Sequence, residues 1–512
     1  MKIRPAETGM VALLTALMLV TMAGAAIGSP GIEALFFSRV GVQFLPQMYL
    51  ILGVVIVVTS LAITALLGRV DLKRLYVALP LVMAGLLIAA RFLIASDFNW
   101  FYPPLWLGMN VSWALLNLFI WGLAGMVCDT RQAKRLFPLF GAGGILGLTG
   151  GGLVTKPLVH WLGTENLLLV WSTTLVLAFF LAQAIARTQG QARPGGRRRD
   201  TPWFEGVKQG YEFARRSVLI RWMAIAAVLF AVLYYSVVFP FSKAVAAEFI
   251  REDDLTAFLG VFQGASMGTA FLASLLLSNR LYARFGFMTM IFAYPVLYFL
   301  GFSTLLVSAV FPLLVAFRFT QLVWSEGVSE GANQAMYNLV PSDQREQTRA
   351  FVRGVANPAG VSLIGGILLL SESILPRGSM FVLGMLAAAV TAYLVWQARG
   401  AYGQALVEAL RAGRPQLFFS EEEPFGGFRR DASAVRVVIE GISSPEVAVR
   451  RVSAEILGNL AVPEAVDAMV AALDDADPAV RAALLRSLAR AGAIRAILEV
   501  VSALEDLDPQ VR

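Results

Sequence analysis

The sequence has few of the residues from which metal sites, disulfide frameworks and catalytic centres are built. It contains one cysteine, Cys128, and one histidine, His160, among 512 residues. This scarcity excludes a disulfide framework and a structural zinc site made from a thiolate or imidazole cluster. No P-loop, catalytic triad or HExxH motif occurs, so the sequence indicates neither an enzyme nor an ATP-driven pump. It also predicts no bound cofactor and no metal.

Charged residues are scarce too. They make up 15% of the chain against 57% for hydrophobic residues, and the mean hydropathy is +0.68. Such a chain is too apolar for a water-soluble protein. The net charge of +7 does not indicate nucleic-acid binding, because the basic residues gather in short clusters between apolar segments. The composition therefore predicts a lipid bilayer, and no nucleic acid, as partner.

Twelve apolar segments are each long enough to cross a bilayer core of about 30 Å as a helix. They lie at residues 9–28, 46–67, 76–96, 103–127, 136–158, 166–187, 219–244, 256–279, 285–306, 310–338, 354–372 and 378–397. Positive charge follows the even-numbered segments, for example at Arg69, Lys73 and Arg74. The positive-inside rule then predicts that both termini are cytoplasmic.

The predicted fold class is an all-α, polytopic membrane protein with a helical tail. We expect two six-helix transmembrane halves, at residues 1–187 and 218–400, joined by a basic cytoplasmic linker at 188–217. Parallel six-helix repeats are the architecture of major facilitator transporters, in which solute binds between the halves. A second linker at 401–430 precedes the tail at 431–512.

A short motif recurs in the two halves. It reads Asp129-x-Arg131-x-x-x-Arg135-x-Phe137 after span four and Asp343-x-Arg345-x-x-x-Arg349-x-Phe351 after span ten. The recurrence supports an internal repeat and makes the acidic and basic positions candidates for gating. The alternative is that both loops merely follow the positive-inside rule.

The tail is also repetitive. Val449-Arg450, Val480-Arg481 and Val511-Arg512 recur at a spacing of 31 residues, and Asp-Pro precedes the last two. This pattern resembles HEAT repeats, helix pairs that stack into a solenoid and bind other surfaces. We expect a docking or regulatory module for a protein partner. Because the third repeat lacks a polar capping helix, we also expect that these residues belong to a longer protein.

Polar side chains within the spans are the candidate solute ligands, because spans one, four, seven and ten of a major facilitator line the central cavity. Asn110, Trp113 and Asn117 share one face of span four, where interhelical hydrogen bonding is the alternative role. The other candidates are Tyr234 and Lys243 on span seven, Gln263 on span eight, and Arg318, Gln321 and Asn333 on span ten.

Charged residues within span ten suggest further roles. Carboxylates inside a membrane are costly and usually face protein or water, so Glu326 and Glu330 are candidates for coupling or gating. The alternative is that both lie in the cytoplasmic headgroup zone. Arg318 presents a planar fork that matches phosphate or carboxylate, but it could also pair with Glu248 or extend to the interface.

The loop after span four also carries a family resemblance. The stretch Asp129-Thr-Arg-Gln-Ala-Lys134-Arg135-Leu-Phe137-Pro138-Leu-Phe-Gly141, with the glycine-rich helix after it, resembles the bacterial and plastid ATP/ADP translocases. The resemblance implies exchange of ATP for ADP, or of another phosphorylated anion, in a bacterial inner membrane. That family carries an arginine and a Lys-Asp pair in its first span, whereas residues 23–30 here hold no cation.

The predicted function is therefore secondary-active transport by alternating access, with a small solute as partner. Two alternatives remain open. One is a membrane sensor or scaffold that does not transport and recruits protein through its tail, which the missing first-span cations favour. The other is a lipid flippase with a mostly apolar cavity. A nucleotide exchanger requires Arg39, Lys243 and Arg318 to line one cavity.

Overall fold

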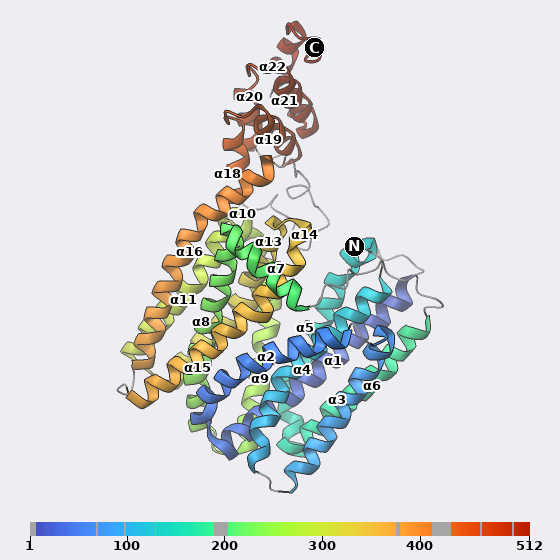
Figure 1. The fold of residues 1–512 in the computed structure, drawn as a ribbon, viewed down its shortest axis with the longest axis vertical. Coiled ribbons are helices and arrows are strands. Elements are labelled where there is room, and N and C mark those ends of the chain that lie inside the picture. The colour runs from blue at the N-terminus through green and yellow to red at the C-terminus, as the bar shows by residue number, and fades with distance from the viewer. Residues whose placement is uncertain are drawn as a thin grey trace. The chain divides into compact units, whose positions relative to one another are not determined.

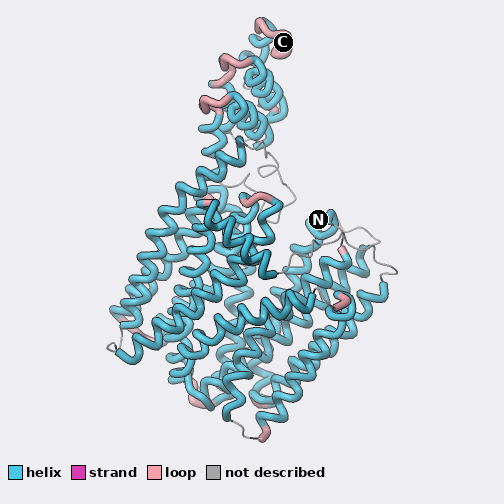
Figure 2. Tube along the Cα trace, viewed as in Figure 1, coloured by secondary structure: helices cyan, strands magenta, loops and turns pink. Residues whose placement is uncertain are grey.

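The computed structural model describes residues 7–67, 70–96, 99–128, 130–188, 203–374, 379–411, 432–460, 463–493 and 496–512. Within these ranges the chain is helical and contains no strand (Figures 1 and 2). Ten apolar stretches are long enough to cross a membrane. The first, Thr8–Ile63, holds two helices. The predicted all-α fold of an integral membrane protein is confirmed.

The helices follow the predicted spans closely. Those of the first half are α1 (Thr8–Phe36), α2 (Leu45–Leu67), α3 (Leu72–Ile94), α4 (Tyr102–Val127), α5 (Thr130–Leu162) and α6 (Leu167–Thr188). The predicted basic linker contains a further helix, α7 (Trp203–Arg216).

Several helices of the second half contain a π-helical turn. The half begins with α8 (Val218–Glu248) and α9 (Glu252–Ala273), which continues through η6 (Ser274–Ser278) into α10 (Asn279–Phe285). After α11 (Phe287–Val307), α12 (Phe311–Trp324) continues through η7 (Ser325–Ser329) into α13 (Glu330–Leu339). Next, α14 (Ser342–Phe351) continues through η8 (Val352–Ala356) into α15 (Asn357–Ile374), and α16 (Ser379–Arg411) follows. Thus α16 extends beyond the predicted end of the membrane domain at residue 400.

The chain divides into two compact units. The first comprises Met1–Ser274, Tyr294–Val328 and Glu346–Tyr393, and the second comprises Leu275–Ala293, Ser329–Arg345 and Leu394–Arg512. All contacts between the two transmembrane halves described below lie within the first unit.

Two close-packed seams join the halves: α5 packs against α9, and α2 packs against α15 (Figure 1). The first seam requires glycine, since a Cβ atom on Gly152 would lie 2.6 Å from the carbonyl oxygen of Gly260. In the second, a Cβ atom on Gly365 would lie 2.5 Å from the backbone nitrogen of Leu50. Small residues at such positions let membrane helices approach closely.

The first helix is longer than predicted. Span one was expected to end near Gly28, before Ser29-Pro30, but α1 continues through Pro30 to Phe36. Proline is tolerated inside transmembrane helices because neighbouring groups satisfy the freed carbonyl. The extension places Glu33 inside the bundle instead of in a loop.

The tail folds as stacked helices, α18 (Ala432–Gly441), α19 (Val447–Leu460), α20 (Pro463–Ala471), α21 (Pro478–Ala491) and α22 (Ile497–Ser502). The repeated arginines explain the period. Arg450 donates two hydrogen bonds to Asp475, at 2.7 and 3.0 Å, and Arg481 donates two to Asp506, both at 2.8 Å. The bond from Arg481, together with the backbone N–H of Asp508, lowers the pKa of Asp506 to about 2.

Candidate functional site

A polar cluster lies among the apolar helices of the first unit, with Arg318 of α12 at its centre. Arg318 is only 7% exposed. Its guanidinium donates a hydrogen bond to the Tyr234 hydroxyl at 3.0 Å and another to the Gln321 side-chain oxygen. It also lies over the Tyr234 ring, with Cζ 4.6 Å from the ring centroid, in a cation–π arrangement. Three predicted solute ligands therefore meet here.

The cluster continues into α11. Gln321 is fully buried, and its Nε2 donates a hydrogen bond to the Tyr294 hydroxyl at 3.2 Å. The Tyr294 hydroxyl is in turn 3.0 Å from the Tyr298 hydroxyl. Buried polar groups that satisfy one another in this way hold a fixed geometry. Arg318 is thus positioned entirely by residues of its own half.

Glu33 of α1 adds a carboxylate from the other half. It is half-buried and is attracted electrostatically to Arg318. No hydrogen bond or ion pair joins these two residues, both of which lie in the described part of the chain. A carboxylate without a direct partner inside a membrane bundle is costly and is a mark of a functional site.

Tyrosine rings from both halves flank these two charges. The ring centroids of Tyr49 on α2 and Tyr235 on α8 are 4.7 Å apart. Each tyrosine lies within electrostatic range of Glu33 and of Arg318. We call Glu33, Tyr49, Tyr234, Tyr235, Arg318 and Gln321 the central cluster.

A second charged group surrounds Arg39, in the π-helical turn η2 (Phe37–Gly41) that ends α1. Arg39 donates hydrogen bonds to Glu252 at 2.8 Å, to Glu165 at 2.6 Å and to the Tyr102 hydroxyl. Arg91 lies 3.2 Å from the second oxygen of Glu165. Every carboxylate in this group therefore has a cation beside it. The bond to Glu252 joins the two halves.

Neighbouring residues strengthen that link. The Thr164 backbone N–H and hydroxyl donate hydrogen bonds to Asp253 at 3.0 and 2.7 Å, and the Thr164 hydroxyl is 3.0 Å from that of Thr256. Thr164 belongs to the first half, and Asp253 and Thr256 belong to the second. We call Arg39, Glu165, Glu252, Thr164 and Asp253 the Arg39 bridge, and the end of the bundle where they lie the Arg39 face.

Other predicted solute ligands lie apart from the central cluster. Lys243 is 52% exposed along its side chain and pairs with Glu372 of its own half at 2.8 Å. Asn110 and Asn117 donate hydrogen bonds at 2.9 Å to carbonyls of their own helix, those of Trp106 and Trp113. Trp113 packs against the core, Gln263 is half-buried on α9, and Asn333 is half-buried on α13 of the second unit.

The predicted gating carboxylates lie on a broken helix. Glu326 is exposed within the π-helical turn η7 of the first unit. Glu330 is exposed at the start of α13 in the second unit, where it accepts a hydrogen bond from Gln334. Such π-helical turns interrupt helices and are frequent at functional sites.

The repeated loop motifs make local contacts. Arg135 pairs with Glu7 within the first half. Arg345 donates a hydrogen bond to the Asn338 carbonyl at 3.1 Å, and Arg349 lies 3.5 Å from Glu346. Asp129 and the side chains of Arg131 and Asp343 lie outside the described residues.

Sequence reasoning missed Glu33 and Glu165. Glu33 was overlooked because the first span was ended at Gly28. A lone carboxylate in the apolar run that continues to Phe37 was the available signal. Glu165 lies in a short turn between spans, where nothing in the sequence identifies its partners.

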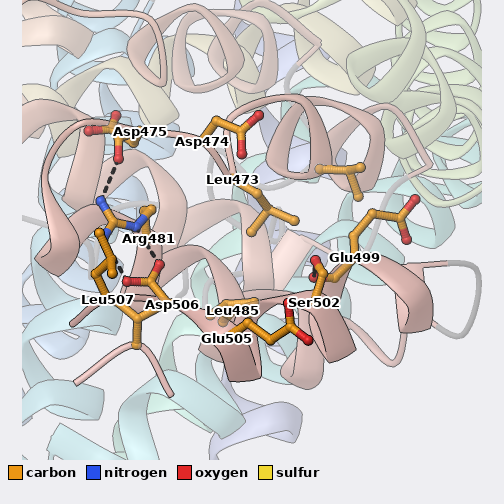
Figure 3. A pocket seen from close by; sticks show the side chains of 13 residues that line it. Leu473, Asp474, Asp475, Arg481, Leu485, Glu499, Ser502, Glu505, Asp506 and Leu507 are labelled. Carbon is orange, nitrogen blue, oxygen red and sulfur yellow. Dashed lines mark hydrogen bonds and ion pairs between the residues drawn. The ribbon is translucent and has the colours of Figure 1, made fainter. Parts of the chain in front are cut away.

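The tail of the second unit contains a pocket of about 550 Å³. Figure 3 shows Leu473 and Leu485 in it, with Asp474, Glu499 and Glu505 around them. Arg481 and Asp506 are paired at one side. Leu498 and Leu507 of the same region are 81% and 96% exposed. The tail thus carries exposed leucines and a pocket lined by both leucine and acidic side chains.

The fold of the membrane domain is that of known transporters. A mutant of the nucleoside transporter NupG superposes with a TM-score of 0.57 at 12% identity, covering 76% of this chain and 99% of its own. A bacterial homologue of the iron transporter ferroportin, in an inward-facing state, gives 0.56 at 12% identity and covers 77% and 99%. A POT family transporter in complex with 5-aminolevulinic acid gives 0.55 at 10% identity and covers 77% and 96%.

Residues 435–512 match the family model of HEAT repeats, which confirms the prediction for the tail. No curated protein sequence gives a significant match to the chain. The chain thus combines a transporter fold with a HEAT-repeat tail.

Proposed function

We propose that this protein is a secondary transporter that moves a small solute by alternating access through the central cluster. The observation that carries the proposal is the position of that cluster. It takes Glu33 and Tyr49 from one half and Arg318, Tyr234 and Tyr235 from the other. In transporters built from two such halves, the solute binds at their interface.

The Arg39 bridge acts as the gate on its face of the membrane. Its hydrogen bonds join the two halves there, which supports assigning this conformation as closed on that face. Partly exposed ion pairs are individually weak, at roughly 0–1 kcal/mol each. The bridge can therefore break and re-form during a transport cycle, while the glycine seams allow the halves to rock.

The positions of the three candidate cations indicate which class of solute fits the site. Exchange of ATP for ADP was expected to require Arg39, Lys243 and Arg318 around one cavity. Arg39 and Lys243 each bind carboxylates of their own instead. Arg318 is the cation of the central cluster, and Glu33 opposes it. This arrangement favours a solute with less negative charge than a nucleotide.

Glu326 remains our candidate for coupling transport to an ion gradient. It is exposed in a π-helical turn of the helix that also carries Arg318. Movement of this helix would therefore alter the surroundings of both residues. The repeated loop arginines are proposed to assist gating at the opposite face.

The tail is proposed to dock a protein partner with a basic, amphipathic segment. Leucines of the pocket would receive its apolar face, and Asp474, Glu499 and Glu505 would attract its lysines or arginines. Charge complementarity of this kind steers association and fixes orientation. A sensor or scaffold would need only this module, so the transport assay below separates the two functions.

The test of transport is a ligand screen followed by counterflow. The purified protein is heated in the presence of nucleotides, phosphorylated metabolites, amino acids and lipids, because a ligand of the native state raises the apparent transition temperature. We expect a small soluble compound to stabilise the protein and to show counterflow in liposomes. Stabilisation by lipid alone would support a flippase, and no counterflow with any stabilising compound would contradict transport.

A further inference from the structure

The hydrogen bonds within the central cluster leave polar groups of Glu33 and Arg318 unused. Arg318 has five N–H groups and uses two of them, toward Tyr234 and Gln321. The Glu33 carboxylate accepts no hydrogen bond from the described part of the chain. The two charges attract each other without forming an ion pair, and we call the space between these two side chains the gap.

The two charges lie at similar depth on opposite halves. At a rise of 1.5 Å per residue along the helix axis, Glu33 lies about 12 Å from the turn at Gly41, and Arg318 lies about 10 Å from Phe311. Gly41 and Phe311 both lie at the Arg39 face, because the Phe311 ring centroid is 6.1 Å from that of Phe249, beside the α8–α9 turn. A small molecule could therefore reach both charges at once.

We propose that this gap binds a small zwitterion, with its ammonium group at Glu33 and its carboxylate at Arg318. A monoanion would leave Glu33 uncompensated inside the membrane, and a monocation would leave Arg318 without a carboxylate partner; both states are costly. A zwitterion compensates both. This inference rests on the proposed transport function and names its substrate class.

The surroundings of the gap fit such a molecule. Tyr49 and Tyr235 lie within electrostatic range of Glu33, and aromatic rings attract ammonium groups more than neutral ones. The guanidinium fork of Arg318 favours a carboxylate, which can accept two parallel hydrogen bonds. Because Arg318 is only 7% exposed, a bulky solute could not reach its guanidinium in this conformation.

The experiment uses a series of ω-amino acids that differ in the distance between the ammonium and carboxylate groups. Glycine, β-alanine, γ-aminobutyrate and ε-aminocaproate are compared by thermal stabilisation and counterflow, each beside the acid and the amine of equal chain length. We expect one member of the series to bind, and its single-charge analogues to bind at least about 10-fold more weakly. Equal binding of an analogue, or no binding by any member, would overturn the proposal.

Two variants assign the ends of the zwitterion. Glu33→Gln should weaken binding of the amino acid about 10- to 100-fold without weakening binding of the matched acid. Arg318→Gln should likewise weaken binding of the amino acid without weakening that of the matched amine. Lys243→Gln is the control and should bind all three compounds as the wild type does. Equal losses of acid, amine and amino acid in both variants would indicate a structural role and contradict the assignment.

Failure of this proposal is distinguishable from failure of transport. If the series does not bind but another class of solute shows counterflow, the zwitterion is wrong and the transport function stands. If no compound of any class shows counterflow, the transport function itself fails.

Discussion

Arg39 and Arg318 stand in the same membrane domain but in opposite electrostatic situations. Arg39 contacts two carboxylates and a tyrosine hydroxyl, so its charge is fully compensated by the protein. Arg318 contacts a tyrosine and a glutamine, and Glu33, a carboxylate that it attracts, forms no ion pair with it. The first arrangement closes a face of the bundle. The second leaves charge available to a solute.

This difference separates gating from binding. A charge compensated within the protein contributes to the choice between conformations, because its partners lie on two halves that move apart. A charge left without a direct partner costs free energy until a ligand compensates it. Each class of site should therefore respond differently when its arginine is neutralised.

The largest effect is expected at the central cluster. Arg318→Gln removes charge-assisted hydrogen bonds that a carboxylate would receive, and each such bond contributes roughly 1.5–3 kcal/mol. We expect the initial rate of counterflow to fall about 100-fold at sub-saturating solute, measured in liposomes with the solute from the screen. Lys243→Gln, which removes a cation already paired with Glu372, should change the rate less than about twofold. A comparable loss of rate in both variants would contradict the claim that Arg318, and not Lys243, is available to the solute.

The next effect concerns Glu326, an exposed carboxylate in η7. If it couples transport to a gradient, Glu326→Gln should abolish uphill accumulation and leave solute exchange within about twofold of the wild type. The measurement is uptake into liposomes with and without an imposed proton gradient. Unchanged accumulation in the variant would remove Glu326 from the coupling mechanism.

A smaller effect is expected at the gate. Arg39→Gln leaves Glu252 without its cation and weakens the link between the halves. Solute affinity should stay within about twofold, because the central cluster is intact, whereas the counterflow rate should change about 10-fold. Glu252→Gln should act in the same direction. A large loss of affinity with an unchanged rate would place Arg39 in the binding site.

The smallest effect lies in the tail, where Arg481 and Asp506 are paired outside the membrane. The pKa of Asp506 is lowered to about 2 from 3.8, so the pair stabilises the tail above about pH 4 and is lost as the pH falls toward 2. Proteolysis of the tail in the detergent-solubilised protein should accelerate over that window. Arg481→Ala should be cleaved faster at neutral pH and respond less to acid. Identical profiles would contradict a stabilising pair.

Much of this fold could be predicted from the sequence. Long apolar runs specify transmembrane helices because a helix satisfies all its backbone hydrogen bonds within one segment, and the Val-Arg period marked the repeats of the tail. Helix ends were less certain. The first span was predicted to end at residue 28, yet α1 continues through Pro30 to Phe36.

The site was only partly predictable for a related reason. Hydropathy identified Arg318, Gln321 and Tyr234 as polar residues in spans, and the structure brings them together. The partners of Lys243 and Arg39 could not be deduced, because Glu372 and Glu252 are far from them in sequence. Glu33 was hidden by the misplaced end of span one.

The most direct test of this account is the distance across the Arg39 face. Spin labels at Ser96→Cys and Ile250→Cys would report it, since both residues are exposed, lie on that face in different halves, and take no part in the bridge. Pulsed electron–electron double resonance in lipid nanodiscs should give a single distance for the unliganded, spin-labelled protein. Adding the transported solute, or introducing Arg39→Gln, should add a second population with a longer distance. A single unchanged distance in all these samples would contradict the proposal that the bridge is a gate.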